Sequence, residues 1–282
     1  MNIEIRTLTE SDLDAADDLM RDAFRRPQSA RAELATYLSL QPDGRLMALI
    51  DGESVGMVGA IDYGPFAYIG TMAVLQTQQR HGIGYALMER MLEWLAARGC
   101  PMARLDASAA GQNLYPKLGF VTDEQTHVFK LQQPISSMCI PDCVSVAREQ
   151  DLAAITEFDA PIFGARRAAV FQRYYDWLND RVFVVHDDTG QLSGYLIAQT
   201  RSLGPWAARE PRDAEALLTA ALALSYDTPP VARVPSSNLA ASELLQRNGF
   251  QLTESLAHMR RGGNQMPGNR ASMYALASFA IG

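Results

Sequence analysis

The chain has 282 residues, of which 48% are hydrophobic and 20% charged, and its net charge is -7. A prior of roughly 150 residues per domain predicts two globular domains. The negative charge argues against nucleic acid as a partner, because phosphate binding needs basic patches. No apolar run approaches the ~18 residues of a membrane-spanning helix, and no signal-peptide pattern opens the sequence. We therefore expect a cytoplasmic protein that binds no membrane.

The first half of the chain alternates strand and helix patterns. Strands are predicted near 2–6, 45–51, 54–62, 67–75 and 102–107, and helices near 10–24, 28–41, 82–98 and 111–118. Two more strands are predicted near 119–122 and 126–132. This order predicts an α/β domain with helices on both sides of a sheet.

A glycine-containing stretch, Gln79-Arg80-His81-Gly82-Ile83-Gly84, lies between a predicted strand and a predicted helix. The first N–H groups of a helix have no intrahelical partner and carry partial positive charge. Glycines also let the backbone approach phosphate oxygens closely. The stretch matches neither a dinucleotide fingerprint nor a Walker loop. It predicts an anion site, although an ordinary strand–helix turn explains it equally well on its own.

The spacing Gln-x-x-Gly-x-Gly resembles the pyrophosphate loop of the GNAT superfamily of N-acyltransferases. The segment Leu114-Tyr115-Pro116-Lys117-Leu118-Gly119-Phe120 resembles the Leu-Tyr-x-x-x-Gly-Phe signature of the same superfamily. The resemblance implies an N-acetyltransferase of the α/β class (an α+β mixed sheet). In that fold a mostly antiparallel twisted sheet is flanked by helices, and two strands splay apart to admit pantetheine.

The resemblance further implies acetyl-CoA, or another acyl-CoA, as co-substrate, with no metal. The pyrophosphate is expected on backbone N–H groups of the glycine stretch, with the Gln79 side chain closing the loop and Arg80 pairing with a phosphate. Pantetheine is expected to pair with the strand before the loop, where the Val74 N–H would polarise the thioester carbonyl. The expected cofactor-binding residues are Met72, Ala73, Val74, Gln79, Arg80, His81, Gly82, Ile83, Gly84, Tyr85 and Ser108.

Tyr115 is the candidate catalytic residue. A phenol is protonated at neutral pH and can donate a proton to a leaving thiolate; the alternative is a core tyrosine on a short helix. Many members of the superfamily carry a glutamate base on the strand before the loop, but this chain has Thr71 there. The acceptor amine must lose a proton before it attacks. A chain of water molecules to Asp62 or Asp106 and an acceptor that arrives already neutral are both open alternatives.

The second half of the chain repeats the plan of the first. Asp12-Leu13 and Asp151-Leu152 each open a predicted helix, and Gly119-Phe120 has a counterpart in Gly249-Phe250. Two tandem GNAT-like domains are therefore expected, a catalytic one at 1–134 and a second one at 138–282. The boundary is expected in the polar stretch 133–137.

The second copy lacks the features of the anion site. Pro211-Arg212-Asp213-Ala214 replaces the glycine loop, Leu245 stands opposite Tyr115, and Asn238 stands where the superfamily often has asparagine. We expect a degenerate domain that binds no acyl-CoA and is structural or helps to form the acceptor site. An unrelated fold is the alternative. The apolar segment 272–279 is expected to be a strand.

The expected activity is acetyl transfer from acetyl-CoA to a primary amine of a small molecule or peptide. The alternative is a non-catalytic acyl-CoA sensor or interaction protein with the same fold, and homodimer formation remains open. Cys139 and Cys143 have the spacing of a redox pair or half a metal site. Because no further Cys or His cluster accompanies them, two incidental thiols are expected.

Overall fold

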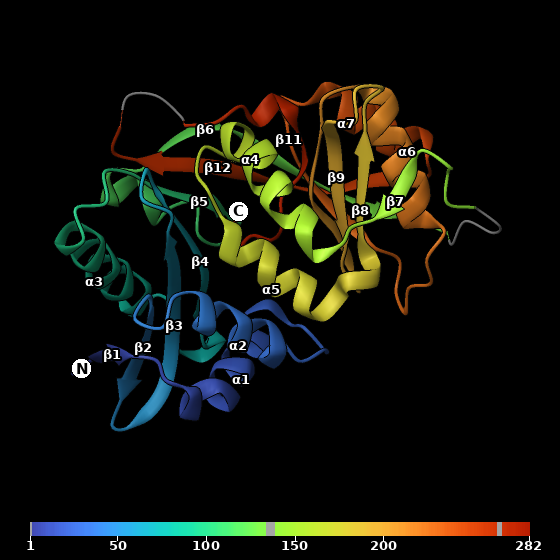
Figure 1. The fold of residues 1–282 in the computed structure, drawn as a ribbon. Helices are drawn as coiled ribbons and strands as arrows, with labels where there is room; N and C mark the ends of the chain where they lie inside the picture. Colours follow the sequence, from blue (N-terminus) through green and yellow to red (C-terminus); the bar gives the residue numbers. More distant parts are fainter. Residues whose placement is uncertain (1, 134–138, 264–266) are drawn as a thin grey trace. The chain divides into compact units, whose positions relative to one another are not determined.

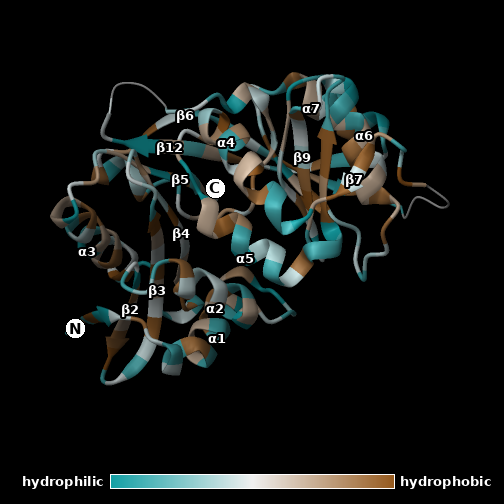
Figure 2. Cartoon of the chain, in the orientation of Figure 1, coloured by the Kyte–Doolittle hydropathy of each residue, from teal (hydrophilic) through white to brown (hydrophobic). Residues whose placement is uncertain are grey.

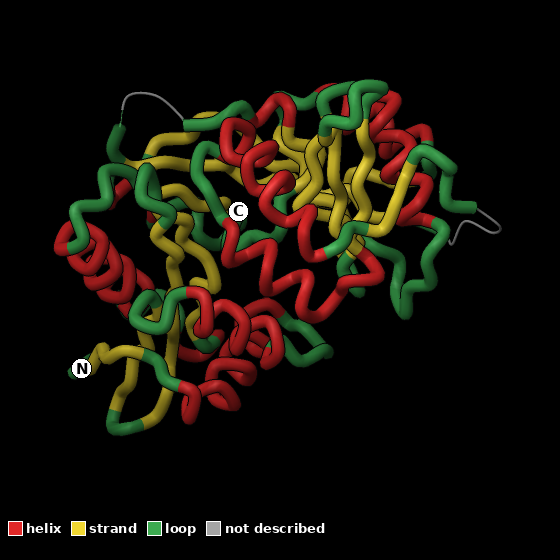
Figure 3. Tube along the Cα trace, viewed as in Figure 1, coloured by secondary structure: helices red, strands yellow, loops and turns green. Residues whose placement is uncertain are grey.

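The computed structural model describes residues 2–133, 139–263 and 267–282 (Figure 1). The chain forms two compact units, each with its own helices and strands (Figure 3). The first contains Met1–Val121, Met259–Asn264 and Phe279–Gly282, and the second contains Thr122–His258 and Gln265–Ser278. Apart from Gln133, the expected boundary stretch lies outside the described residues.

The first unit contains a mixed sheet. Its strands β1 (Glu4–Thr7), β2 (Arg45–Ile50), β3 (Glu53–Asp62) and β4 (Ala67–Val74) pair antiparallel in that order. Strand β5 (Ala103–Ala107) joins β4 in parallel. The helices are α1 (Leu13–Phe24), α2 (Arg31–Leu40) and α3 (Ile83–Ala97), and the 3-10 helices are Glu10–Asp12, Gln76–Gln78 and Tyr115–Leu118. The predicted elements of residues 2–118 are thus confirmed, with boundaries shifted by a few residues.

Helices cover both faces of this sheet. The apolar stripe of α1, which includes Leu13 and Leu19, packs with α2 against Met47 of β2 and Met57 of β3. On the other face, a methyl group at Gly56 would lie 3.2 Å from the Ile83 side chain of α3. Figure 2 shows hydrophilic and hydrophobic residues interspersed along the helices.

Strands β4 and β5 separate after a short parallel pairing. The register joins Ala67 to Ala103 and Tyr68 to Arg104, near the start of both strands. The rest of β4 pairs with β3, with an irregularity between Met57 and Gly59 of that strand. The second half of β4 therefore has one edge that β5 does not pair with, as expected for a strand that accepts an extended ligand.

The second unit repeats this plan. Strands β7 (Val144–Val146), β8 (Val182–His186), β9 (Leu192–Ala198) and β10 (Ser202–Ala208) pair antiparallel in that order, and β11 (Val231–Pro235) joins β10 in parallel. The helices are α4 (Leu152–Phe163), α5 (Ala168–Leu178), α6 (Pro211–Leu222) and α7 (Leu239–Arg247). The short strand β13 (Met273–Ala275) pairs with β10, which confirms the strand expected within 272–279.

The helix starts of the two copies are built alike. The Asp12 carboxylate accepts the backbone N–H of Thr9 at 2.8 Å, and the Asp151 carboxylate accepts that of Arg148 at 2.7 Å. In both copies a 3-10 turn precedes a 12-residue helix. The internal repeat that the sequence predicts is therefore present, and it includes the hydrogen bonds that cap the first helix of each copy.

The two units exchange segments of chain. Strand β6 (Val121–Leu131) belongs to the second unit from Thr122 onward, where it pairs antiparallel with β11. Strand β12 (Phe250–Arg261) passes into the first unit at Met259, and Phe279–Gly282 also belongs there. The compact units therefore differ from the ranges 1–134 and 138–282 at these segments.

One sequence prediction in this region is wrong. Two strands were predicted near 119–122 and 126–132, but β6 is a single strand from Val121 to Leu131. The polar residues between the predicted strands belong to the strand: Asp123 is exposed, and Glu124 and Gln125 are half-buried. Within the part of the chain that the structure describes, no helix combines the length and apolarity that a membrane span requires.

Candidate active site

The glycine stretch forms the N-terminus of α3. Gly82 is the N-cap residue and has φ +86°, a left-handed conformation that favours glycine. A methyl group at Gly82 would meet no atom of the protein within 4 Å. The N–H groups of Ile83, Gly84 and Tyr85 lie in the first helical turn, where no intrahelical acceptor is available. The loop thus presents unpaired donors to open space, which fits a phosphate group.

The end of β4 lies beside this loop, and one edge of the strand is not paired with β5 there. The Gln79 side chain donates to the Val74 carbonyl at 3.2 Å, which ties the start of the loop to the end of β4. The Leu75 N–H donates to Val55 of β3 at 3.0 Å. Because successive N–H groups of a strand point to opposite sides, the Val74 N–H points away from β3. It is placed to hydrogen-bond an extended ligand lying along β4.

The two sequence motifs meet in the first unit. A methyl group at Gly84 would lie 3.6 Å from the Leu114 side chain, so the start of α3 adjoins the segment that carries Tyr115. Ser108 follows β5 and accepts the N–H groups of Gly111 and Gln112 at 2.9 and 3.0 Å, which forms the turn into that segment. Four other residues were predicted to contact the cofactor. Of these, Met72 and Ala73 lie on β4, and Arg80 and His81 are exposed in the loop.

Tyr115 is 6% exposed and begins a 3-10 helix. Its ring packs edge-on against Phe120 at 5.8 Å between ring centres. A methyl group at Gly111 would lie 2.9 Å from the Tyr115 ring, so glycine makes room for it. Burial raises the pKa of Tyr115 to about 12. The phenol is therefore protonated throughout the physiological range and available as a donor.

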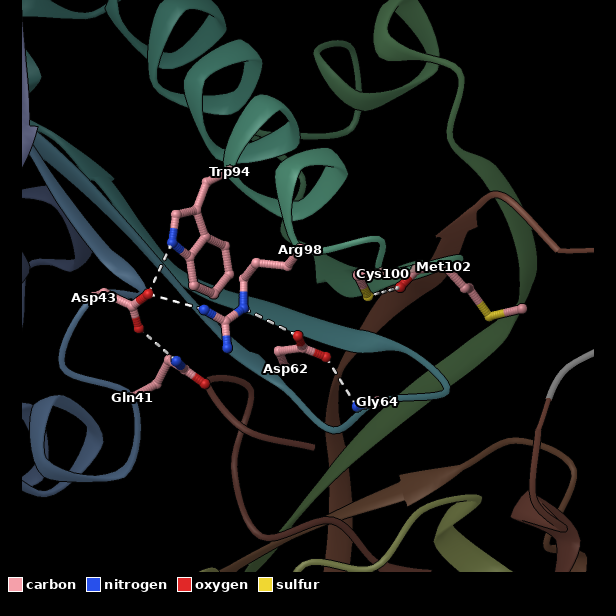
Figure 4. Close-up of polar contacts among 8 residues, drawn as sticks. All are labelled: Gln41, Asp43, Asp62, Gly64, Trp94, Arg98, Cys100 and Met102. Carbon is pink, nitrogen blue, oxygen red and sulfur yellow. Dashed lines mark hydrogen bonds and ion pairs between the residues drawn. The ribbon is translucent and has the colours of Figure 1, made fainter.

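The two carboxylates considered as bases both accept hydrogen bonds from the protein, and one of them lies away from the loop. Asp62 accepts hydrogen bonds from Arg98 at 3.1 Å and from the Gly64 N–H at 2.8 Å (Figure 4). Arg98 lies at the C-terminal end of α3, so Asp62 is at the opposite end of that helix from the loop. Asp106 accepts the hydroxyl hydrogen of Tyr68. The structure therefore does not place Asp62 at the anion site.

Sequence reasoning missed two sets of side-chain contacts in this unit. Asp22 of α1 accepts the Gln76 N–H at 2.7 Å, and Arg25 donates to the Gln76 side chain at 3.1 Å, which ties the end of α1 to the segment before the loop. Arg45 donates to Thr71 on β4 at 2.9 Å. The available signal was an arginine in the apolar strand Arg45–Ile50, which the pattern treats only as a strand residue.

The corresponding region of the second unit is filled by the chain itself. Helix α6 begins with Pro211, which has no N–H, and the Asp213 carboxylate in its first turn accepts a hydrogen bond from Ser193. Strand β13 pairs with β10, and Leu276 donates to Arg233 of β11 at 2.8 Å. Its Tyr274 is buried against Trp206 with ring centres 4.9 Å apart. The second unit therefore differs from the first at both features: its helix begins with proline and carries an acidic residue in the first turn, and a strand of the chain pairs with β10.

Comparison with known proteins assigns both halves to one family. A model of the acetyltransferase (GNAT) family matches residues 12–120, and a model of an acetyltransferase (GNAT) domain matches residues 155–275. The chain therefore belongs to the GNAT family, with two GNAT domains in tandem, and is an N-acetyltransferase. The expectation of a GNAT-like second domain is confirmed, and the alternative of an unrelated fold is wrong.

Individual relatives extend over most of the chain. Holothin acyltransferase from Pseudoalteromonas is 25% identical over 87% of this chain and 84% of its own length. A crystal structure from Pyrococcus horikoshii, of a protein assigned but not demonstrated to be an acetyltransferase, is 27% identical, with a TM-score of 0.87 over 99% of this chain and 96% of that chain. A GCN5-related N-acetyltransferase from Sphaerobacter thermophilus shares the fold, with a TM-score of 0.69 at 17% identity over 94% of this chain and 98% of that chain.

Gly82→Asp is expected to weaken CoA binding at least tenfold, about 1.4 kcal/mol. The substitution adds a carboxylate and a Cβ at the loop, where phosphate oxygens would have to approach. Titration calorimetry with CoA measures the effect. The matched control is Gly99→Asp, because Gly99 also has positive φ and open surroundings but lies after the other end of α3. Equal CoA affinity in the two folded variants would contradict the loop assignment.

Proposed function

We propose that the first unit transfers an acetyl group from acetyl-CoA to a primary amine of a small molecule. The observation that carries the proposal is the meeting of the α3 N-terminus with the Tyr115 segment, through Gly84 and Leu114, beside the open edge of β4. The name of the Pseudoalteromonas relative supports a small-molecule acceptor.

The residues of the first unit account for binding of the donor, stabilisation of the oxyanion and protonation of the leaving group. The acceptor amine attacks in its neutral form, and the proton that its nitrogen then releases to water restores the Tyr115 hydroxyl. The N–H groups of the α3 N-terminus hold the pyrophosphate, and the open edge of β4 orients the pantetheine arm. Acyl-CoA supplies the activated acyl group as a thioester. The Val74 N–H stabilises the negative charge that develops on the carbonyl oxygen. The Tyr115 hydroxyl donates to the departing thiolate.

The raised pKa of Tyr115 predicts the alkaline behaviour of the enzyme. An acid must be protonated to act, and a phenol with a pKa of about 12 loses its proton only far above neutrality. The kcat measured with an acceptor that is neutral throughout should therefore show no loss attributable to this group between about pH 7 and 10. A descending limb in that interval that disappears in Tyr115→Phe would show a lower phenol pKa in the working enzyme.

One CoA is expected to bind per chain, in the first unit only. Asp213 and β13 fill the corresponding region of the second unit. Calorimetry on the whole chain should give a stoichiometry near one, and Gly82→Asp should weaken binding at that single site without leaving a second site of unchanged affinity. A stoichiometry near two would contradict the assignment of the second domain as degenerate.

The competing function is an acyl-CoA sensor without turnover. Thiol release from acetyl-CoA in the presence of an amine panel, measured beside CoA binding, separates the two. Release that depends on an amine supports the enzyme. Tight CoA binding with no release on any amine, under conditions where the protein is folded, would favour the sensor.

A further inference from the structure

An open groove lies along one flank of α3, in the first unit. Its walls are formed by α3 between Glu89 and Ala96, by residues 117–119 and by Arg261 of β12. The groove has a volume of about 560 Å³, within the roughly 300–1,000 Å³ typical of small-molecule sites. Glu89 lies about two helical turns beyond Gly82. The groove is therefore separate from the loop that we propose binds pyrophosphate.

One wall of the groove carries two positive charges. Lys117 and Arg261 are both exposed, and a methyl group at Gly119 would lie 3.6 Å from Arg261 Nε. In the part of the chain that the structure describes, neither of the two side chains has an ion pair or a hydrogen bond. The residues outside that part, 1, 134–138 and 264–266, include no aspartate or glutamate. Both cations are therefore available to a negatively charged group in the groove.

The wall formed by α3 carries two negative charges. Glu89 accepts a hydrogen bond from the Tyr85 hydroxyl, which raises the pKa of Tyr85. Glu93 pairs with Arg90 at 3.1 Å, and the Glu93 side chain is 66% exposed. Because a carboxylate has about four acceptor positions, each glutamate can accept further hydrogen bonds from a ligand. The two walls thus bear opposite charges, and a ligand with a single charge is repelled by one of them.

A smaller hollow adjoins the groove and is lined mostly by apolar side chains. Leu92, Ala96 and Arg261 contribute to the walls of both. The hollow has a volume of about 70 Å³, and its other walls include Leu95 and Met102, which are 3% and 5% exposed. Since an apolar cavity of about 150 Å³ holds benzene, this hollow has room for a short aliphatic group of about three carbon atoms.

We propose that the groove binds an aliphatic amino acid such as valine. Arg261 and Lys117 bind its carboxylate. Glu89 and Glu93 bind its ammonium group, and its side chain occupies the hollow beside Leu92. A zwitterion is attracted by both walls, and the hollow adds a preference for a small aliphatic side chain. This inference does not depend on acetyl transfer, because none of these residues belongs to the loop or to the proposed transfer centre.

Titration calorimetry on the full chain, without acetyl-CoA, tests the proposal with valine and three analogues. Isobutylamine lacks the carboxylate of valine, 3-methylbutanoate lacks its ammonium group, and glycine lacks its aliphatic side chain. Valine should bind with a Kd of about 1 mM, as expected for a small ligand in an open site. Each analogue should bind at least about threefold more weakly. No binding of valine well above that Kd, or equal binding of all four compounds, would overturn the proposal.

Arg261→Leu removes the charge that lies beside Gly119. The second copy has a leucine at the corresponding position, because a methyl group at Gly249 would lie 3.8 Å from the Leu131 side chain. The Kd for valine should rise by about 3- to 10-fold, since charged hydrogen bonds at exposed sites are weaker than buried ones. The matched control is Arg247→Leu, which removes an exposed cation from the second unit. Equal Kd values in the two variants would place valine elsewhere and contradict the proposal.

Cys100 provides a readout inside the hollow. Its thiol lines the hollow and donates to the Met102 carbonyl at 3.3 Å (Figure 4). Burial raises the pKa of this thiol, so its alkylation by N-ethylmaleimide is followed at mildly alkaline pH. Saturating valine should slow the alkylation of Cys100, whereas the exposed Cys139 and Cys143 serve as internal controls whose rates stay unchanged. Equal alkylation rates of Cys100 with and without valine would also overturn the proposal.

Discussion

Replacement of Tyr115 by phenylalanine is expected to lower kcat by about 10²–10⁴-fold, the range typical of a lost general acid. The change removes only the hydroxyl and leaves the ring that packs on Phe120. CoA affinity should therefore stay nearly unchanged, because the phosphate donors belong to the start of α3. The measurement is kcat at saturating acetyl-CoA and amine, with CoA binding measured separately.

Tyr226→Phe is the matched control for this experiment. Burial raises the pKa of Tyr226 to about 12 as well, but the residue lies in the second unit, where its hydroxyl donates to the Ala221 carbonyl at 2.9 Å. Its loss should cost about 1 kcal/mol of stability without changing turnover. A kcat within a factor of two of the parent in Tyr115→Phe would reduce Tyr115 to a packing residue.

Arg167→Met is expected to destabilise the second unit by about 3–5 kcal/mol, because it leaves the buried Asp159 carboxylate without its cation. Asp159 and Arg167 are 1% and 2% exposed, and the Tyr195 hydroxyl donates to the same carboxylate at 2.5 Å. The guanidinium also lies 3.8 Å from the centre of the Phe163 ring. Urea unfolding followed by probes in the second unit measures the loss.

The neighbouring arginine provides the control. Arg166 pairs with Glu157 at 2.5 Å, but both side chains are largely exposed, and such pairs contribute about 0–1 kcal/mol. Arg166→Met should therefore unfold close to the parent. The double variant Arg167→Met/Asp159→Leu should recover much of the lost stability, since it removes both charges together. Similar destabilisation in Arg166→Met and Arg167→Met would contradict a specific role for the buried pair.

The local features of this protein could be predicted from its sequence. The glycine stretch, the short helix at Tyr115 and the capped starts of α1 and α4 depend on residues close together in the chain. Local hydrogen bonds and backbone preferences determine them, so their patterns are visible in a single sequence. The repeat itself was found because Asp12 and Asp151 have the same role in each copy.

The features that were missed depend on residues far apart in the chain. Nothing near β6 in the sequence shows that it pairs with β11, about a hundred residues later. Arg45 was interpreted as an ordinary strand residue, because its contact with Thr71 forms only when β2, β3 and β4 pair in the sheet. Thr71 in turn was noted only as the absence of a glutamate. Side-chain contacts of this kind depend on the sheet register, which single-sequence patterns do not give.

The exchange of segments between the units has a consequence for how this protein can be made. The first unit includes Phe279–Gly282, and there a methyl group at Gly70 would overlap Ala280, while the Tyr63 hydroxyl donates to Ile281 at 2.7 Å. During synthesis, this unit cannot acquire Phe279–Gly282 until those residues have left the ribosome. Until then, the partly folded unit exposes the surface around Gly70. Chaperone capture of nascent chains should therefore be greatest for ribosomes stalled between the codons for residues 131 and 279.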